Sequence, residues 1–330
     1  MLIFARELCD YTQMLETPLS LQQAQTFLLQ HLGTAPESVS LIGAGAWSQC
    51  FAFRVNNHQD LVIRFGKYLD DFQKDQRAYA YATPALPIPK VTGIGITFDG
   101  YYAISTRVYG IPLEEVNAAQ WQALVPALAD ALEAMRTADI SATTGFGGWG
   151  EDGNAKLTTW AEHLLLVDYD GPDRRTYGWH DKLAKHLYGM ATFERGFTLL
   201  QSVAHTPVPR CLVHCDLINR NALVEQDRLT GVFDWGCSLY GDHLYELAWF
   251  EFWSEWHPAL DIVLLRKALA QRWHAAGYVP HNLEQRLMAC YLHIGLDHLA
   301  YHAFTGDTAT LTATANRIMA FIISLSTSRA

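Results

Sequence analysis

The feature that most constrains the fold of this chain is a change in hydrophobic periodicity. In the first part, apolar and polar residues alternate in short segments, which is the period of half-buried β-strands. Beyond it, long segments show helical spacing. We therefore predict an α+β fold of two lobes: a small antiparallel β lobe over residues 1–107, a hinge at 108–112 and a larger, mainly helical lobe over 113–330.

The first part predicts an antiparallel sheet with one inserted helix. Ser20 followed by Gln23 is a capping box, which opens a helix ending near His31. A second helix is predicted from about residue 70 to 82, where Pro84 closes it. The strands are predicted at 49–55, 61–65, 91–96 and 101–107, with a turn at 56–58.

The second part predicts helices almost throughout. Asn117 and Gln120 form another capping box, which leads a helix to about Ala138. A glycine-rich stretch at 145–153 interrupts the helical pattern. Further helices are predicted at 158–168, 178–204, 242–256, 258–276, 282–304 and 307–325.

The densest polar cluster inside an apolar frame lies between residues 211 and 236. The run CLV leads into His214 and Asp216, Asn221 precedes the run ALV, and the run VF leads into Asp234. We expect these residues at the ends of short neighbouring strands. One carboxylate can then orient a hydroxyl and accept its proton, while the other, with the amide oxygen, can hold magnesium. Each residue alone fits a turn or cap, but the combined spacing favours phosphoryl transfer.

The segments HCDLINRN, VFDWG and GDHLYELAWF resemble the aminoglycoside phosphotransferase family, within it the branch that modifies hygromycin B. The resemblance extends from about residue 40 to 305 and includes further motifs of that branch at 86–89, 144–147, 158–160 and 294–297. It implies a protein-kinase-like fold and ATP-dependent O-phosphorylation of an aminoglycoside antibiotic, as in resistance or self-protection.

The resemblance also assigns roles in the polar cluster. Asp216 would be the catalytic base, and His214 would support its loop. Asn221 and Asp234 would bind magnesium. Asp242 would be structural, with a hydrogen bond to the catalytic loop.

The resemblance places the nucleotide in the first lobe. Segment 41–51 corresponds to a hairpin that covers the phosphates, where Gly43 and Gly45 would permit a tight turn. Ser48 would offer its hydroxyl or backbone N–H to phosphate oxygens.

Three further positions complete the expected nucleotide site. Arg64 stands where the family has a lysine on the phosphates, so the charge is kept on a planar guanidinium. Asp75, on the following helix, would pair with it. The connector around Thr106 and Val108 would present backbone groups to the adenine edge.

Charge is the main guide to the acceptor. The chain has 34 acidic and 24 basic residues and a net charge of −10. Residues 1–110 contribute 9 acidic and 8 basic side chains, and residues 111–330 contribute 25 and 16. Such an excess disfavours nucleic-acid binding and attracts cations. We therefore expect a cationic small-molecule acceptor, contacted by Glu251, Glu255 and Asp297 near a cluster of aromatic residues.

Several other classes of protein are not indicated. The six cysteines form no C-x-x-C pair, no apolar run approaches the ~20 residues of a membrane span, and Arg6, Glu7 and Asp10 interrupt the first apolar stretch. His298 and His302 are spaced like metal ligands, but no H-E-x-x-H motif contains them. We expect a cytoplasmic monomer without nucleic-acid or membrane partners.

Two other functions remain open. One is a metabolic kinase of the same fold, acting on choline, homoserine or another alcohol. The other is a nucleotide-binding module without catalysis, which Arg64 favours and the Asp216, Asn221 and Asp234 set opposes. The sequence does not distinguish ATP from GTP.

Overall fold

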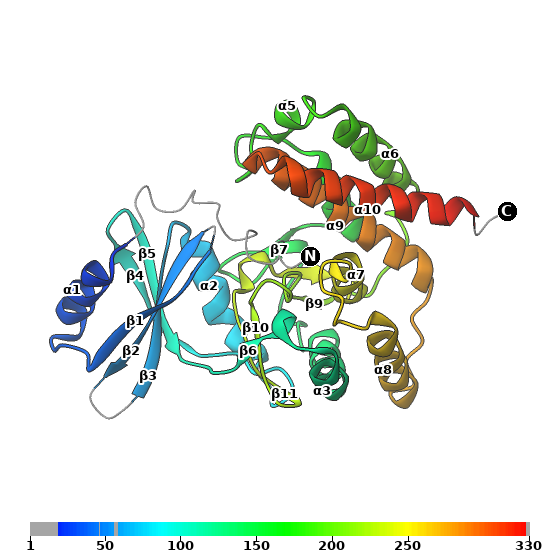
Figure 1. Cartoon of the computed structure of the whole chain (residues 1–330). Coiled ribbons are helices and arrows are strands. Elements are labelled where there is room, and N and C mark those ends of the chain that lie inside the picture. The colour runs from blue at the N-terminus through cyan, green and yellow to red at the C-terminus, as the bar shows by residue number, and fades with distance from the viewer. Residues whose placement is uncertain (1–18, 46, 56–58, 328–330) are drawn as a thin grey trace.

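The computed structural model describes residues 19–45, 47–55 and 59–327. A sheet lobe and a larger helical lobe lie side by side (Figure 1), which confirms the predicted α+β architecture. The predicted turn at 56–58 and the first apolar stretch lie outside the described residues. Within the described ranges, no helix combines the length and apolarity needed to cross a membrane.

The first lobe is a five-stranded antiparallel sheet with the order β1-β2-β3-β5-β4. Phe51, Phe53 and Phe65 are buried in a cluster with Ala24 and Leu28 of the outer helix. The strands are β1 (Ser38–Ala44), β2 (Ser48–Val55), β3 (Gln59–Gly66), β4 (Val91–Thr97) and β5 (Gly100–Thr106).

Two helices flank this sheet. α1 (Leu21–Leu32) starts with the predicted capping box of Ser20 and Gln23 and lies on the outer side. α2 (Leu69–Ala78), extended by the short η1 (Tyr79–Tyr81), lies between the sheet and the second lobe (Figure 1). This places one face of α2 on the sheet, through Phe72, and leaves the other for the second lobe.

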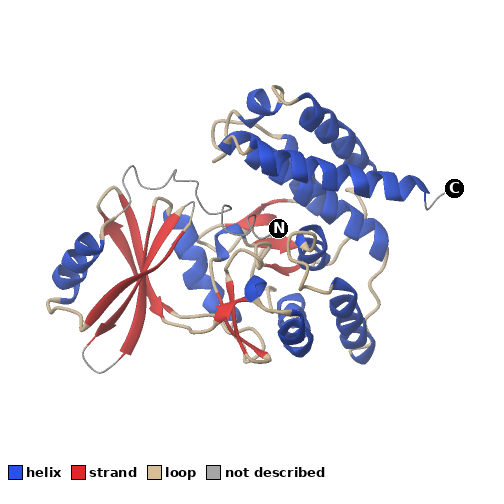
Figure 2. Cartoon of the chain, viewed as in Figure 1, coloured by secondary structure: helices blue, strands red, loops and turns tan. Residues whose placement is uncertain are grey.

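The second lobe is mainly helical (Figure 2), and α3 begins with the predicted capping box of Asn117 and Gln120. Its central helix, α9, packs against α5, α6, α7 and α10 and is buried along most of its length. The helices are α3 (Ala118–Arg136), α4 (Trp160–Leu165), α5 (Trp179–Leu183), α6 (Leu187–Val203), α7 (Leu244–Trp253), α8 (Ile262–Ala275), α9 (Leu283–Thr305) and α10 (Thr308–Thr327), with short 3-10 turns η2 (Leu113–Glu115), η3 (Leu166–Asp168) and η4 (Trp235–Cys237).

The helical lobe differs from the prediction in two places. The single helix predicted at 178–204 is α5 and α6, separated by a turn in which the His186 N–H donates to the Leu183 carbonyl. The glycine-rich stretch forms a hairpin of β7 (Phe146–Trp149) and β8 (Ala155–Leu157). Gly145 has a φ of 76°, and a Cβ there would lie 2.0 Å from the Ala155 carbonyl oxygen. Glycine therefore permits the hairpin at this close approach.

Two small sheets carry the polar cluster. One has the order β11-β10-β6 and the other β8-β7-β12-β9. The strands before His214 and after Asn221 therefore belong to different sheets, which corrects the expectation that they are neighbours. The pairing is antiparallel, with β9 on β12 and β10 on β11. The remaining bounds are β6 (Ile111–Pro112), β9 (Cys211–Val213), β10 (Ala222–Glu225), β11 (Arg228–Val232) and β12 (Leu239–Gly241).

Candidate active site

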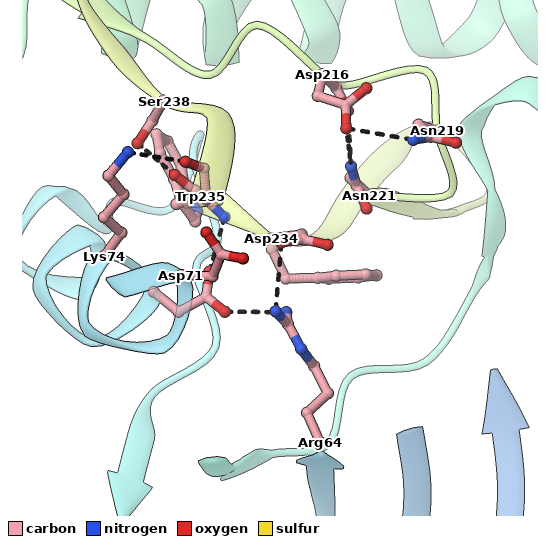
Figure 3. A network of polar contacts seen from close by, with 12 residues as sticks. Arg64, Asp71, Lys74, Asp216, Asn219, Asn221, Asp234, Trp235 and Ser238 are labelled. Atoms are coloured by element: carbon pink, nitrogen blue, oxygen red, sulfur yellow. Dashed lines mark hydrogen bonds and ion pairs between the residues drawn. The ribbon is translucent and has the colours of Figure 1, made fainter. Parts of the chain in front are cut away.

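The loop between β9 and β10 holds Asp216 by hydrogen bonds from two amides (Figure 3). Asn221 Nδ2 lies 3.0 Å from Asp216 Oδ2 and 2.9 Å from the Asp216 carbonyl oxygen. Asn219 Nδ2 lies 3.3 Å from the same Oδ2. Because Asn221 donates from its nitrogen, its amide oxygen is the atom turned away from Asp216. Sequence reasoning missed Asn219, since only its place in this loop reveals a contact.

The surroundings of Asp216 raise the proton affinity of its carboxylate. Burial raises the pKa of Asp216 well above its usual range, and the negative charge of Asp234 adds to the effect. The hydrogen bonds from Asn219 and Asn221 act in the opposite direction. A carboxylate with a raised pKa is a stronger proton acceptor, which suits a general base.

His214 joins this loop to the strand end before Asp234. Its Nε2 lies 3.0 Å from the Phe233 carbonyl oxygen, and its Nδ1 lies 3.3 Å from the Asp216 amide nitrogen. Burial lowers the pKa of His214 to about 4, so the ring is neutral. A neutral ring with its proton on Nε2 satisfies both contacts. This placement supports the role expected for His214.

A buried glutamate accepts hydrogen bonds from the backbone of the same loop. Glu246, on α7, accepts hydrogen bonds at Oε1 from the backbone N–H groups of His214, at 2.5 Å, and Cys215, at 2.8 Å. Burial raises the pKa of Glu246 to about 7, against these hydrogen bonds. Sequence reasoning did not assign this role to Glu246, because only the folded chain shows its contact with the loop.

The expected partner of Asp242 is therefore wrong. Its carboxylate pairs with the Arg286 guanidinium of α9, with Nε 2.8 Å from Oδ2, and also accepts from the Leu244 N–H. Both side chains are buried. With both oxygens occupied there, Asp242 has a structural role at the start of α7, and Glu246 makes the hydrogen bonds to the catalytic loop.

Asp234 lies opposite Asp216 and is linked to Arg64 (Figure 3). Arg64 places one guanidinium nitrogen 3.3 Å from Asp234 Oδ1 and another 2.9 Å from Asp75 Oδ2. The Asp234 side chain is 40% exposed, so its carboxylate remains accessible. The structure thus brings the expected arginine, its expected partner and the candidate metal ligand together.

Helix α2 fixes the backbone of the two residues that follow Asp234. Asp234 adopts the left-handed conformation, with φ 62° and ψ 62°, which non-glycine residues keep only where surrounding contacts hold it. Asp75 Oδ1 accepts from the Trp235 N–H at 2.7 Å, and Lys74 Nζ donates to the Gly236 carbonyl at 2.8 Å. Asp75 therefore binds both Arg64 and the backbone of the Asp234 loop.

The hairpin between β1 and β2 carries the expected glycines. The Gly45 N–H donates to the Ser48 carbonyl at 2.9 Å. Neither Gly43 nor Gly45 has a positive φ, so a tight left-handed turn is not the reason for glycine at these positions. A Cβ at Gly43 would meet no atom within 4 Å. Their lack of side chains leaves open space beside the hairpin.

The connector after β5 is held between the lobes. The Thr106 N–H donates to the Lys90 carbonyl, and its hydroxyl accepts from the Lys90 N–H. Val108 packs on β11, where a Cβ at Gly231 would lie 2.6 Å from its side chain. The connector therefore has a fixed position beside the second lobe.

The three expected acceptor carboxylates have different surroundings. Glu251 pairs with Arg266 of α8 at 2.5 Å, and Glu255 with Arg317 of α10 at 3.1 Å. These pairs give both glutamates a structural explanation, which the sequence separation of the arginines had hidden. Asp297 pairs with an arginine, Arg174, at 2.8 Å, but 47% of its side chain is exposed.

Asp297 shares a face of α9 with a residue that is influenced by the charge of Asp216. One turn further along α9, burial raises the pKa of Tyr301, and the charge of Asp216 contributes to the rise. This face of α9 therefore approaches the candidate base. Glu255 is more exposed than Asp297, at 59%, whereas Glu251 is 15% exposed.

The oxygen donors of the site fit a magnesium ion whose remaining ligands come from a bound nucleotide and water. Across the described residues, no three or more His, Cys, Asp or Glu side chains form a group that could hold a metal. His298 and His302 are therefore not part of such a group. The accessible Asp234 carboxylate and the outward Asn221 amide oxygen supply two hard oxygen donors. Magnesium commonly takes one or two protein oxygens together with phosphate oxygens and water.

Comparison with known proteins gives consistent results. Residues 38–283 match the model of the phosphotransferase enzyme family. Hygromycin-B 4-O-kinase from Escherichia coli is 30% identical over 296 residues, which cover 88% of this chain and 81% of the relative. These matches confirm the family resemblance seen in the motifs.

Solved structures agree on the fold. A thermostable mutant of aminoglycoside phosphotransferase APH(4)-Ia, in a ternary complex with AMP-PNP and hygromycin B, is 29% identical with a TM-score of 0.78, covering 91% of this chain and 98% of the other. APH(2")-IIIa, in complex with GDP and kanamycin, has a TM-score of 0.65 at 17% identity, covering 91% and 98%, and shows similarity of fold alone.

Proposed function

This chain belongs to the phosphotransferase enzyme family, and on that premise we propose that it transfers the γ-phosphate of ATP to a hydroxyl of a cationic aminoglycoside of the hygromycin B type. The observation that carries the proposal is the pair of carboxylates, Asp216 and Asp234, fixed on facing loops. The similarity to hygromycin-B 4-O-kinase supports the substrate class.

The residues of the second lobe divide the chemical work. Asp216 orients the acceptor hydroxyl and accepts its proton, while Asn219 and Asn221 fix the carboxylate by hydrogen bonds. His214 and Glu246 hold the loop backbone so that the carboxylate does not reorganise during transfer. Asn221 and Asp234 would hold magnesium, which neutralises the charge on the phosphates when it is bound.

The nucleotide lies under the first lobe in this proposal. Arg64 contributes a fixed positive charge toward the phosphates, with Asp75 to orient it. The Gly43–Gly45 hairpin and Ser48 cover the phosphates, and the connector at Thr106 and Val108 contacts the base. ATP is the proposed donor, and GTP is the alternative that nucleotide competition would test.

The acceptor approaches from the side of α9. Asp297 offers an accessible carboxylate to an ammonium group of the acceptor, and Tyr301, one turn further along α9, has a pKa raised in part by the charge of Asp216. A cationic acceptor also gains from the net charge of −10. These features favour an aminoglycoside over choline or homoserine, each of which offers one cationic group.

The test is an acceptor panel with purified protein. ATP consumption and acceptor phosphorylation are measured together for hygromycin B, kanamycin, choline and homoserine. We expect hygromycin B to have the highest kcat/KM, with magnesium required. A higher kcat/KM for choline or homoserine would favour the metabolic kinase. Nucleotide binding without transfer to any acceptor would favour the non-catalytic module.

We also propose that the enzyme acts as a cytoplasmic monomer. In the described part of the chain, Cys50, Cys211, Cys215, Cys237 and Cys290 are free thiols, as expected in a reducing compartment.

A further inference from the structure

A single arginine of the second lobe reaches across to the first. Arg175 lies in the segment between η3 and α5, and its guanidinium contacts both acidic residues at the start of α2. Nη1 and Nη2 lie 3.0 and 2.9 Å from the two carboxylate oxygens of Asp71, and Nη2 also lies 3.1 and 3.0 Å from those of Asp70. This fork of charge-assisted hydrogen bonds connects the lobes away from the hinge.

The same guanidinium is linked to the phosphate-covering hairpin. It lies 3.8 Å from the centre of the Tyr68 ring, in cation–π geometry. Tyr68 makes an edge contact with Trp47, whose ring centre is 5.6 Å away. Trp47 directly precedes Ser48 at the end of the hairpin. Arg175, Tyr68 and Trp47 thus form a continuous chain of contacts from the second lobe to the hairpin.

Asp71 extends the connection to the candidate metal ligand. Its Oδ1 is so close to Gly236 that a Cβ there would lie 2.8 Å away (Figure 3 shows Asp71 beside this loop). The Asp71 side chain is only 13% exposed, and burial raises its pKa while Arg175 opposes the rise. Arg175 therefore compensates a largely buried charge next to the Asp234 loop.

The neighbouring arginine anchors the segment on the acceptor side. Arg174 pairs with Asp297 of α9 and donates to the carbonyls of Val167 and Tyr169. Two consecutive arginines therefore contact different parts of the molecule. Arg174 contacts α9, the candidate acceptor helix, and Arg175 contacts α2 of the first lobe.

We propose that Arg175 is a positioning residue that latches the phosphate-covering hairpin and α2 onto the acceptor lobe. It contacts α2 and Tyr68, and acts on the nucleotide through them. The inference rests on the proposed function for its kinetic consequence, since closure of the two lobes aligns the γ-phosphate with the acceptor hydroxyl.

The test compares Arg175→Gln, Arg175→Lys and Arg228→Gln. Arg228 forms an exposed pair with Glu225 on the β10–β11 hairpin and serves as the matched control. For Arg175→Gln we expect the ATP KM to rise and kcat to fall, with kcat/KM for ATP lower by roughly ten- to a hundred-fold, the range for a misplacement of order 1 Å. Arg175→Lys keeps the charge but loses the planar guanidinium over the Tyr68 ring. It should therefore recover only part of the lost kcat/KM for ATP. Arg228→Gln should match the unchanged protein.

A second measurement separates this latch from general loss of structure and from the proposed function. Hydrogen exchange of segment 41–51 is followed with ATP and magnesium bound, and thermal unfolding is measured in parallel. We expect faster exchange of that segment in Arg175→Gln at nearly the same melting temperature. Because this arm needs no acceptor, it reports on the latch even if no acceptor is phosphorylated. Unchanged kinetics and exchange in Arg175→Gln would overturn the latch.

Discussion

The Asp216 carboxylate is the group on which the proposed chemistry depends most directly. Asp216→Asn keeps the size of the side chain but removes the proton acceptor. We expect kcat to fall by about a hundred- to ten-thousand-fold, the usual contribution of a general base. Nucleotide affinity, measured by titration calorimetry, should stay within a small factor. A variant with nearly normal kcat would remove Asp216 from its role.

Glu246 gives a pH-dependent contribution to stability. Burial raises its pKa from 4.5 to about 7, so between these values the folded chain binds a proton that the unfolded chain has released. The contribution of this group to the free energy of unfolding therefore falls as pH rises through that window. Glu246→Gln removes the titration and keeps an acceptor for the two N–H groups.

The measurement is urea denaturation of both proteins at pH 5 and pH 8. The free energy of unfolding of Glu246→Gln, relative to that of the unchanged protein, should be higher at pH 8 than at pH 5. The same stability difference at both pH values would show that Glu246 does not titrate in this range.

At the scale of elements, the buried pair of Asp242 and Arg286 joins the start of α7 to α9. Arg286→Met would leave the Asp242 carboxylate buried without its partner. We expect a loss of about 3–5 kcal/mol in the free energy of unfolding, as for other broken buried pairs. Addition of Asp242→Asn should restore part of the loss, since the uncompensated charge is then removed. A loss below about 1 kcal/mol would contradict this account.

Much of the element order could be predicted because its signals are local. The capping boxes at Ser20 and Asn117 lie within four residues, and strand alternation is visible in each segment. The strands β1, β6 and β12 are not predicted. β1 is a mostly exposed edge strand without alternation of buried and exposed residues, and β6 and β12 have too few residues to show periodicity. β6 and β12 exist only through pairing with segments distant in sequence.

The same division holds for the candidate site. The order of Asp216, Asn221 and Asp234 is a sequence signal, so these residues could be selected in advance. The roles of Glu246 and Glu251 depend on a loop and an arginine from other elements, and the sequence contains no sign of those contacts. The choice of acidic residues near aromatics therefore takes no account of the arginines that pair with them.

At the scale of the whole molecule, charge should affect binding of the acceptor more than its conversion. The Debye length falls from about 10 Å at 0.1 M salt to about 3 Å at 1 M. The KM for hygromycin B should rise clearly over this range, while kcat changes less. A neutral acceptor with the same kcat/KM and no dependence on salt would contradict the cationic substrate class.

Individual carboxylates should differ in this experiment. Asp297→Asn should raise the KM for hygromycin B and reduce its dependence on salt, because the side chain is accessible on α9. Glu251→Gln should instead lower the melting temperature with little change in KM, because it loses the Arg266 pair between two helices. An equal rise in KM for both variants would show that Glu251 is also part of the acceptor site.

Helix α2 belongs to the first lobe by sequence, yet many of its polar contacts are with the second. Lys74 donates to the Gly236 carbonyl, and Gln73 donates to Glu151 at 2.6 Å. We therefore expect the hinge at 108–112 to divide the chain in sequence without separating two cooperative folding units. Residues 1–107 expressed alone would keep the sheet and α1 together, while α2 would lose the contacts that hold it. Its amide protons in the intact chain should exchange in step with those of the Asp234 loop rather than those of the sheet.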